Sequence, residues 1–467
     1  MAGYFSVGES KIRPGAYFNV SKKGEENEFG AVDGVVAILF KASFGPLGTV
    51  RVIEREDGYG QIYGEGAATD ALREALYGGA QKLIACRVGN GGTAETVSLA
   101  AATGSVVLTA KYPGKMGFTV SVREKLADDT RKECIIYSGT REFERVNFTA
   151  GDDEAKALAE GFAKSKNFTA KLEGDGAAGV VTNVNQSAFT AGEDPEVTNA
   201  DYGMALEEVE KYYFNTICVD TEDSGVHNLL SAFLDRIYEA GQFGIGVVAE
   251  KTTLDFEERI ASATGFGKEN MVYILNADVK AKEEALEGYR VAALVAGMIA
   301  ACPSNQSLTH TVIDRYTEIG EIFTNSQYEK AIKNGCVALA YNTDNEVWLD
   351  AAVNTLISPD ENHDEGWKKI RRVKTRYELL YRTNAQADAL VGKVDNDVNG
   401  RAIIVGKLQK IVNDMVQEGK LVSGTVTESS TYVPDGDSCY FDIDVIDKDS
   451  AEHVYLFYKF RFSTQAE

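Results

Sequence analysis

The order of buried strands and helices along the chain is the feature that most limits its fold. An unbroken apolar run, Val35–Phe40, is followed by a helical pattern at Thr69–Tyr77 and by a second apolar run at Lys82–Val88. Continuous apolar runs of this length are typical of strands that are buried on both faces of a parallel sheet. The pattern therefore predicts a β-α-β unit, in which a helix connects two parallel strands.

This alternation stops near residue 90 and resumes near residue 198. The intervening segment is rich in Gly, Thr, Ala, Val and Asn, and its short alternating runs, such as Ser105–Ala110 and Phe118–Arg123, predict a mainly β domain. Helix and strand patterns then alternate again as far as the helix Tyr289–Cys302. The simplest account is an α/β core whose parallel sheet is assembled from both sides of an inserted, β-sandwich-like domain.

The last quarter of the chain has a different pattern. Two long helices are expected at Glu365–Thr383 and Gly400–Glu418, and three strand candidates follow, at Leu421–Thr427, Tyr440–Ile446 and Val454–Phe462. We therefore predict an α/β core, an inserted β domain and a C-terminal α+β domain, with extended arms at both ends. The expected boundaries are 1–28 for the N-terminal arm, 29–90 and 198–350 for the core, 91–197 for the inserted domain, 351–452 for the C-terminal domain and 453–467 for the C-terminal arm.

Composition and motifs give no sign of catalytic chemistry. The net charge of -23 argues against binding nucleic acid through overall basicity, and the chain contains only four His. Its six Cys are scattered without a CxxC pair, which fits a reducing cytoplasm and gives no zinc-binding spacing. No phosphate-binding loop or metalloprotease motif is present, and the apolar helix at Val291–Cys302 is far shorter than the ~20 residues of a membrane span. We expect no catalytic, cofactor or metal site and no insertion into a membrane.

One helix is unusually basic for an acidic chain. Within Trp367–Tyr381, apolar residues recur at steps of three and four and form a stripe, while cations cover the other faces. These cations either pair with carboxylates of the same chain or form a docking surface for an acidic partner; nucleic acid is a weaker third possibility. The cations are Lys368, Lys369, Arg371, Arg372, Lys374 and Arg376.

The two ends of the chain share a second unusual feature. The N-terminal residues have little local structure to fold onto, and the C-terminal run VYLFYKFRF is amphipathic and strongly β-prone. An unpaired strand of this kind is an aggregation hazard. Pairing with a neighbouring subunit by β-augmentation resolves both problems, although a terminal meander within one chain is the simpler alternative.

Several short motifs then point to a known family. The chain resembles the contractile tail sheath proteins of bacteriophages and R-type bacteriocins, including the diffocin type, over essentially its whole length. The segments that carry the resemblance are Arg13–Tyr17 (RPGAY), Gly45–Gly48 (GPLG), Tyr112–Gly117 (YPGKMG), Gly392–Asp397 (GKVDND) and Gly400–Arg401.

The resemblance implies a structural polymer, not an enzyme. Sheath subunits of this family stack as hexameric rings around an inner tube and contract to drive that tube through a target cell envelope. The α/β core is called subtilisin-like in topology, which carries no protease activity. The implied partners are further copies of the chain, the inner tail tube protein, and baseplate and terminator or collar proteins, with no nucleic acid. The implied location is a phage or phage-tail-like particle, made in the bacterial cytoplasm.

In this family the arms add strands to sheets of neighbouring subunits, and the C-terminal domain lies close to the tube. Carried onto this sequence, the basic helix becomes a candidate tube contact through the six cations named above. Two other classes stay open, an α/β enzyme with a β substrate domain and an oligomeric binding module that does not polymerise. The residues expected to pair between subunits are Arg13, Pro14, Gly15, Tyr17 and Val20 in one arm and Val454, Leu456, Tyr458, Phe460 and Phe462 in the other.

Overall fold

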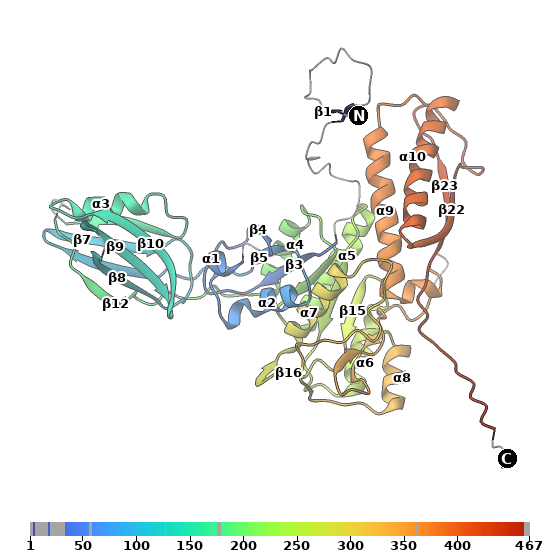
Figure 1. Ribbon diagram of the computed structural model, residues 1–467, viewed down its shortest axis with the longest axis horizontal. Helices are drawn as coiled ribbons and strands as arrows, with labels where there is room; N and C mark the ends of the chain where they lie inside the picture. The colour runs from blue at the N-terminus through green and yellow to red at the C-terminus, as the bar shows by residue number, and fades with distance from the viewer. Residues whose placement is uncertain are drawn as a thin grey trace.

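The computed structural model describes residues 3–4, 17–18, 33–55, 58–126, 128–174, 179–359 and 363–461. Three bodies follow one another along the long axis of the molecule, with the inserted domain at one end, the α/β core in the middle and the C-terminal helices at the other end (Figure 1). Two short strands near the N-terminus, β1 (Gly3–Tyr4) and β2 (Tyr17–Phe18), pair in parallel.

A seven-stranded sheet forms the centre of the core, in the order β19-β15-β14-β13-β3-β5-β4. Strand β3 pairs with β5 on one side and with β13 on the other, although the inserted domain separates β5 from β13 in the sequence. All the pairings are parallel except that of β4 with β5. The strands are β3 (Val35–Phe40), β4 (Val50–Glu54), β5 (Lys82–Arg87), β13 (Thr216–Val219), β14 (Ile245–Ala249), β15 (Met271–Ile274) and β19 (Cys336–Val337).

Helices cover both faces of this sheet. Alternate residues of β3 enter two separate cores: Val36, Ile38 and Phe40 pack toward α2 and α7, whereas the residues between them pack toward α4, α5 and α6. Burial on both faces explains why the whole run is apolar. The helices are α1 (Gly60–Tyr63), η1 (Ala67–Thr69), α2 (Asp70–Tyr77), α4 (Asn199–Val209), α5 (Ser224–Glu239), α6 (Phe256–Phe266), α7 (Gly288–Ala301) and α8 (Asn325–Lys333).

Two small sheets complete the core. A three-stranded sheet has the order β17-β16-β18, and a two-stranded hairpin joins β20 to β21. The hairpin turns around Asn342–Asn345. The strands are β16 (Val279–Ala281), β17 (Glu284–Leu286), β18 (Glu318–Ile319), β20 (Leu339–Tyr341) and β21 (Val347–Leu349).

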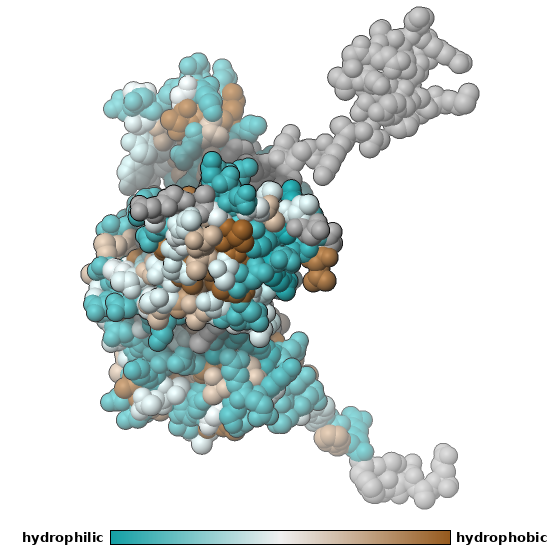
Figure 2. Space-filling view, turned by 90° about the vertical axis from the view of Figure 1, so that its left-hand side faces the viewer, coloured by the Kyte–Doolittle hydropathy of each residue, from teal (hydrophilic) through white to brown (hydrophobic). Residues whose placement is uncertain are grey.

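The inserted domain is a sandwich of two antiparallel sheets. One sheet has the order β10-β9-β8-β12 and the other β11-β7-β6, and they enclose a core rich in Phe side chains. Seen from this end, the surface is largely hydrophilic with small apolar patches (Figure 2). The elements are β6 (Thr96–Ala101), β7 (Gly104–Ala110), β8 (Phe118–Lys125), β9 (Asp128–Ser138), β10 (Arg141–Thr149), α3 (Glu154–Phe162), β11 (Phe168–Glu173) and β12 (Val184–Ala188).

A buried joint connects the inserted domain to the core. Phe44, from the loop after β3, packs edge-to-face against Tyr112, Phe118 and Phe143 of the inserted domain. The fully buried Arg87 guanidinium donates to the carbonyls of Ala42, Gly45 and Pro113, at 2.8, 2.7 and 2.8 Å. The loops that carry the GPLG and YPGKMG motifs therefore contact each other at this joint.

Glycine is required at this joint. A Cβ on Gly114 would lie 1.9 Å from the carbonyl oxygen of Ser43, far inside van der Waals contact. The carboxylate of Glu95 accepts hydrogen bonds from the backbone N–H groups of Gly117 and Phe118, which fixes the end of the same loop. Packing and hydrogen bonds together make this a tight connection between two bodies.

The C-terminal domain consists of two long helices and a two-stranded antiparallel sheet. Helix α9 (Ile370–Leu390) extends beyond the predicted end at Thr383, because helix-compatible residues continue until Gly392, whose φ is +70°. Its other elements are η2 (Glu365–Lys368), α10 (Val398–Gln417), β22 (Leu421–Glu428) and β23 (Phe441–Asp447).

Candidate assembly interface

The C-terminal arm leaves the body of the molecule as an extended segment (Figure 1). Residues 451–461 form no strand, so the described part of the third strand predicted at Val454–Phe462 is not paired in a terminal meander. The large apolar side chains of the arm face solvent, with exposures of 91% for Phe457 and 93% for Phe460. A strand needs a hydrogen-bonded partner, and the described part of this chain provides none to the arm.

The structure describes only some of the other residues that are predicted to pair between subunits. Val454, Leu456, Tyr458 and Phe460 all belong to the exposed segment. Tyr17 lies in β2, opposite Gly3. The remaining predicted positions, Arg13, Pro14, Gly15, Val20 and Phe462, lie outside the described residues.

The β22–β23 sheet has only two strands in the described structure. Its register pairs Gly424 with Val445 and Val426 with Ile443. Strand β22 packs on α10 through Leu421 and Val426, whereas Ile443 and Ile446 of β23 are partly exposed, at 37% and 58%. The outer edge of β22 is already occupied in part, because the Gln409 side chain bonds the Gly424 carbonyl and the Val426 N–H. Strand β23 therefore offers the edge whose backbone N–H and C=O groups are available to a further strand.

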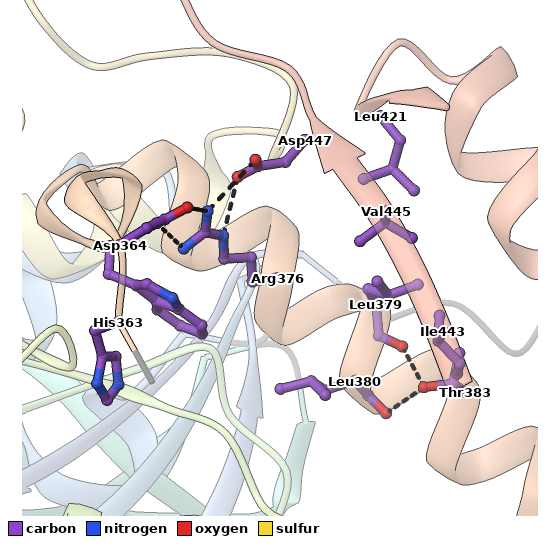
Figure 3. Close-up of a pocket in the computed structure, with 11 residues that line it drawn as sticks. His363, Asp364, Arg376, Leu379, Leu380, Thr383, Leu421, Ile443, Val445 and Asp447 are labelled. Atoms are coloured by element: carbon purple, nitrogen blue, oxygen red, sulfur yellow. Dashed lines mark hydrogen bonds and ion pairs between the residues drawn. The ribbon is translucent and has the colours of Figure 1, made fainter. Parts of the chain in front are cut away.

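A slot of about 520 Å³ lies between β23 and α9 (Figure 3). Ile443 and Val445 of β23 point toward Leu379 and Leu380 of α9 across it. Thr383 also lines the slot. Its hydroxyl donates to the Leu379 and Leu380 carbonyls and therefore adds no unsatisfied polar group to the slot. The slot is mainly apolar. Its lining residues are His363, Asp364, Trp367, Arg376, Leu379, Leu380, Thr383, Leu421, Ile443, Val445 and Asp447.

A group of ion pairs closes one end of the slot and holds the root of the arm. Asp447, which is 8% exposed at its side chain, accepts bidentate hydrogen bonds from Arg372 at 2.6 and 2.8 Å and a further one from Arg376 at 3.0 Å. Lys369 lies 2.9 Å from Asp449 and 3.1 Å from Glu452. We call these residues, from α9 and from 447–452, the arm clamp.

Neighbouring groups reinforce the arm clamp. Arg376 also reaches Asp364 at 2.9 Å and stacks over the Trp367 ring at 4.5 Å. The carboxylate of Glu452 accepts from the hydroxyls of Ser307 and Thr309, which ties the end of the clamp to the core. The chain is therefore held as far as residue 452, and the extended arm begins directly after it.

One further cation of the basic helix is buried in the contact with the core. The Lys374 ammonium donates to the carbonyls of Ile299, Ala300 and Cys302 at the C-terminal end of α7, and lies 3.7 Å from Asp33. Burial lowers the pKa of Lys374. Because an ammonium favours the carbonyl end of a helix, this contact fastens α9 to the core.

The six predicted tube contacts are therefore all engaged within the chain. Arg371 donates to the Ser450 hydroxyl, and Lys368 pairs with Glu365 at 2.8 Å. One alternative from the sequence is that these cations pair with carboxylates of the same chain. The structure shows such pairing for Lys368, Lys369, Arg372 and Arg376. The partner carboxylates at 447, 449 and 452 were not identified from the sequence, although an acidic run just before a β-prone tail is a visible signal.

The clamp carboxylates make the domain sensitive to acid. Burial alone would raise the pKa of Asp447, but hydrogen bonds from Arg372 and Arg376 hold it below its usual value; Lys369 does the same for Asp449. Because these pKa values are lowered in the folded state, the stabilisation is present above the ordinary carboxyl pKa of about 3.9 and is lost as the pH falls through the lowered values. We expect the clamp to open below about pH 4, read by fluorescence of Trp367. A signal that stays flat down to pH 2 would contradict this.

Neither a metal-binding group nor a membrane-spanning helix is found among the described residues. No group of three or more His, Cys, Asp and Glu side chains among them could hold a metal ion. Within the same residues, every helix is too short or too polar to cross a membrane. The Cys residues are all free thiols.

The fold and the domain order define a class of protein, a multidomain α/β protein of the kind found in tail sheaths. Residues 195–355 match the family described as the phage tail sheath protein central domain. The resemblance to sheath proteins that the sequence motifs predict is thereby confirmed. This match favours the structural role that the resemblance implies over the α/β enzyme that stayed open as an alternative.

Similar proteins extend this match over most of the chain. The sheath tail protein of Desulfitobacterium hafniense has the same fold, with a TM-score of 0.70 and 20% identity, covering 93% of this chain and 100% of that one. The helical sheath of the anti-feeding prophage in its contracted state is similar at a TM-score of 0.53 and 11% identity, covering 97% and 99%. The uncharacterised protein YqbK of Bacillus subtilis (strain 168) is 24% identical over 402 residues, covering 83% of this chain and 82% of its own length.

Proposed function

We propose that this chain is the repeating subunit of a contractile tail sheath, which polymerises as stacked hexameric rings around an inner tube and contracts to drive the tube through a cell envelope. The observation that carries the proposal is the C-terminal arm, which exposes apolar side chains and has no partner in the described part of its own chain. The fold similarity to a sheath in its contracted state supports the same conclusion.

The arm of one copy pairs with the β22–β23 sheet of another. A third strand beside β23 would continue the sheet over α9, and its alternate side chains would enter the slot. Val454, Leu456, Tyr458 and Phe460 lie two residues apart and so share one face. Each such side chain contributes about 1.5–3 kcal/mol when fully buried, which suffices to hold copies together once several are buried.

The arm clamp explains why the arm reaches a neighbour. Residues 447–452 are held along α9 and against the core, so the arm cannot turn back directly beside its own β23. The clamp also leaves the segment after Glu452 as the hinge. Rigid bodies could then rotate past one another during contraction while the arms keep them connected.

The N-terminal arm and the ends of the polymer are proposed to contact other partners. The N-terminal arm, including Arg13–Val20, pairs with a further copy, and the ends of the polymer meet baseplate and terminator proteins. Contact of the basic helix with the tube stays a prediction. Such a contact would compete with the carboxylates that already bind Lys369, Arg372 and Arg376.

A pair of adjacent substitutions tests the slot. Ile443→Lys places a charge in the slot, whereas Asp442→Lys places the same residue on the opposite face of β23, where the side chain is exposed. We expect Ile443→Lys to remove most sedimentable polymer, because a buried unpaired ammonium is strongly unfavourable, while Asp442→Lys polymerises like the wild type. Equal polymer yields from the two folded variants would show that the slot does not receive a strand.

A further inference from the structure

A second cleft, of about 860 Å³, lies between the core and the inserted domain, next to the buried joint. Its core side consists of Pro46, Arg51, Gly58, Gln61 and Ile62. Its other side comes from the inserted domain, and both sides carry cations and apolar groups. The inserted-domain residues are Lys111, Tyr112, Phe143, Glu144, Lys164, Ser165, Lys166 and Asn167.

The cations of this cleft have no carboxylate partner among the residues that the structure describes. Arg51, Lys111, Lys164 and Lys166 all line it, and none of them forms an ion pair with a carboxylate in the described part of the chain. The one carboxylate in the lining, Glu144, accepts instead from the Asn167 amide. By contrast, Lys156 and Lys171 of the same domain lie 4.0 and 3.8 Å from Glu160 and Glu173. Positive charge is therefore concentrated at one place on a chain of net charge -23.

The walls of the cleft are fixed before any partner arrives. Phe143 packs against Phe44, and Tyr112 packs against the same ring, so the floor belongs to the joint itself. Arg87 ties the loop that carries Pro46 to the loop that carries Tyr112, through the carbonyls of Gly45 and Pro113. A preformed cleft loses little entropy when it is filled.

We infer that this cleft receives a carboxylate-bearing segment of a second copy of this chain. The inference rests on the proposed function, because a polymer brings copies into contact at high local concentration. Charge complementarity identifies the partner: Asp and Glu number 71 against 48 Lys and Arg, so the surface of another copy is predominantly acidic. The apolar floor, with Ile62, Tyr112 and Phe143, suits a peptide segment better than a small inorganic ion.

Isotope-mixed cross-linking tests this directly. Copies grown in ¹⁴N and in ¹⁵N are mixed, assembled and treated with a carbodiimide, which couples an amine to a carboxylate only when the two are in contact. We expect mixed-isotope peptides that join Lys164 or Lys166 to an Asp or Glu of another copy. Their yield should fall severalfold in 0.5 M salt, where surface charges are screened over a few ångströms.

Two matched variants supply the control. Lys164→Glu with Lys166→Glu reverses the cleft, and Lys156→Glu with Lys171→Glu makes the same change in charge elsewhere on the inserted domain. The first variant should give polymers that dissociate at a lower salt concentration than the second. Equal salt resistance, or cross-links of Lys164 and Lys166 confined to one copy, in polymers of normal length would overturn the inference and leave the proposed function intact.

Two other outcomes separate the remaining explanations. If the wild-type chain forms no polymer, the proposed function fails, and cross-links between copies at high concentration still decide whether the cleft binds a second copy. If heparin protects Lys164 and Lys166 from modification and no mixed-isotope peptide forms, the cleft binds an anionic polysaccharide and the inference is overturned.

Discussion

Removal of residues 454–467 is expected to give a folded subunit that does not polymerise. Residues 454–461 form no hydrogen bond or ion pair with the rest of the described chain, and their apolar side chains are exposed. Over residues 454–461, the deletion therefore removes no contact that stabilises the single chain, and we expect the melting temperature to match that of the full chain. Sedimentation and electron microscopy should detect polymer only for the full chain.

A variant of unchanged length shows which part of the arm matters. Replacing Val454, Leu456, Tyr458 and Phe460 with Ser keeps the backbone that would form strand hydrogen bonds but removes the apolar face. We expect this variant to lose most polymer as well, since burial of those side chains supplies the larger part of the binding free energy. Normal polymerisation of the truncated chain would refute pairing through the C-terminal arm.

Asp447→Asn is expected to have the second largest effect, which is to weaken the docking of the β22–β23 sheet on α9. Asp447 is the one carboxylate that both Arg372 and Arg376 reach from α9, and its side chain is nearly buried. Loss of its charge leaves two guanidinium groups short of a partner. We expect the docking of β22–β23 on α9 to weaken by about 2 kcal/mol, less than for a fully buried pair because both arginines are partly exposed.

Amide hydrogen exchange measures this loss of stability separately for each strand and helix. A local measurement is needed because a chain of several domains does not unfold in a single two-state transition. The amides of β22 and β23 should exchange faster in Asp447→Asn, and those of the core sheet should be unchanged. Asp442→Asn, an exposed position five residues away on the same strand, serves as the control. Identical exchange in the two variants would mean that the arm clamp does not hold the hairpin.

The core could be predicted from the sequence because its signal is local. Val35–Phe40 and Lys82–Val88 are apolar because each strand is buried on both faces, and β3 and β5 form almost at those residues. Some boundaries depend on capping. Helix α6 begins after Asp255, which forms a capping box with Glu258, and ends at Gly267 in the left-handed conformation.

The candidate interface was harder to predict because its partners are distant in the sequence. The basic helix is visible as a pattern, but the carboxylates that pair with Arg372 lie 75 residues further along the chain. Burial of Lys374 depends on how α9 packs against the end of α7, which no periodicity reveals. The tail at Val454–Phe462 has the pattern of a strand, yet strand formation needs a partner, and the described part of the chain supplies none to residues 454–461.

The arm clamp also changes how a tube contact should be tested. Reversing the charges of Lys369, Arg372 and Arg376 would place three carboxylates beside Asp447, Asp449 and Glu452 and would release the hairpin itself. A loss of tube binding in such a variant would therefore report on folding as much as on contact. Lys368 is the better probe, because its one ion pair among the described residues is with its neighbour Glu365 on the surface.

Negative-stain electron microscopy of the full chain, purified alone, tests the central proposal most directly. The account predicts hollow tubes with regular ribs, formed without nucleotide or other proteins, because each copy carries both an arm and a sheet that can accept one. Monodisperse particles that stay monodisperse after addition of the tube protein would contradict assembly into a sheath.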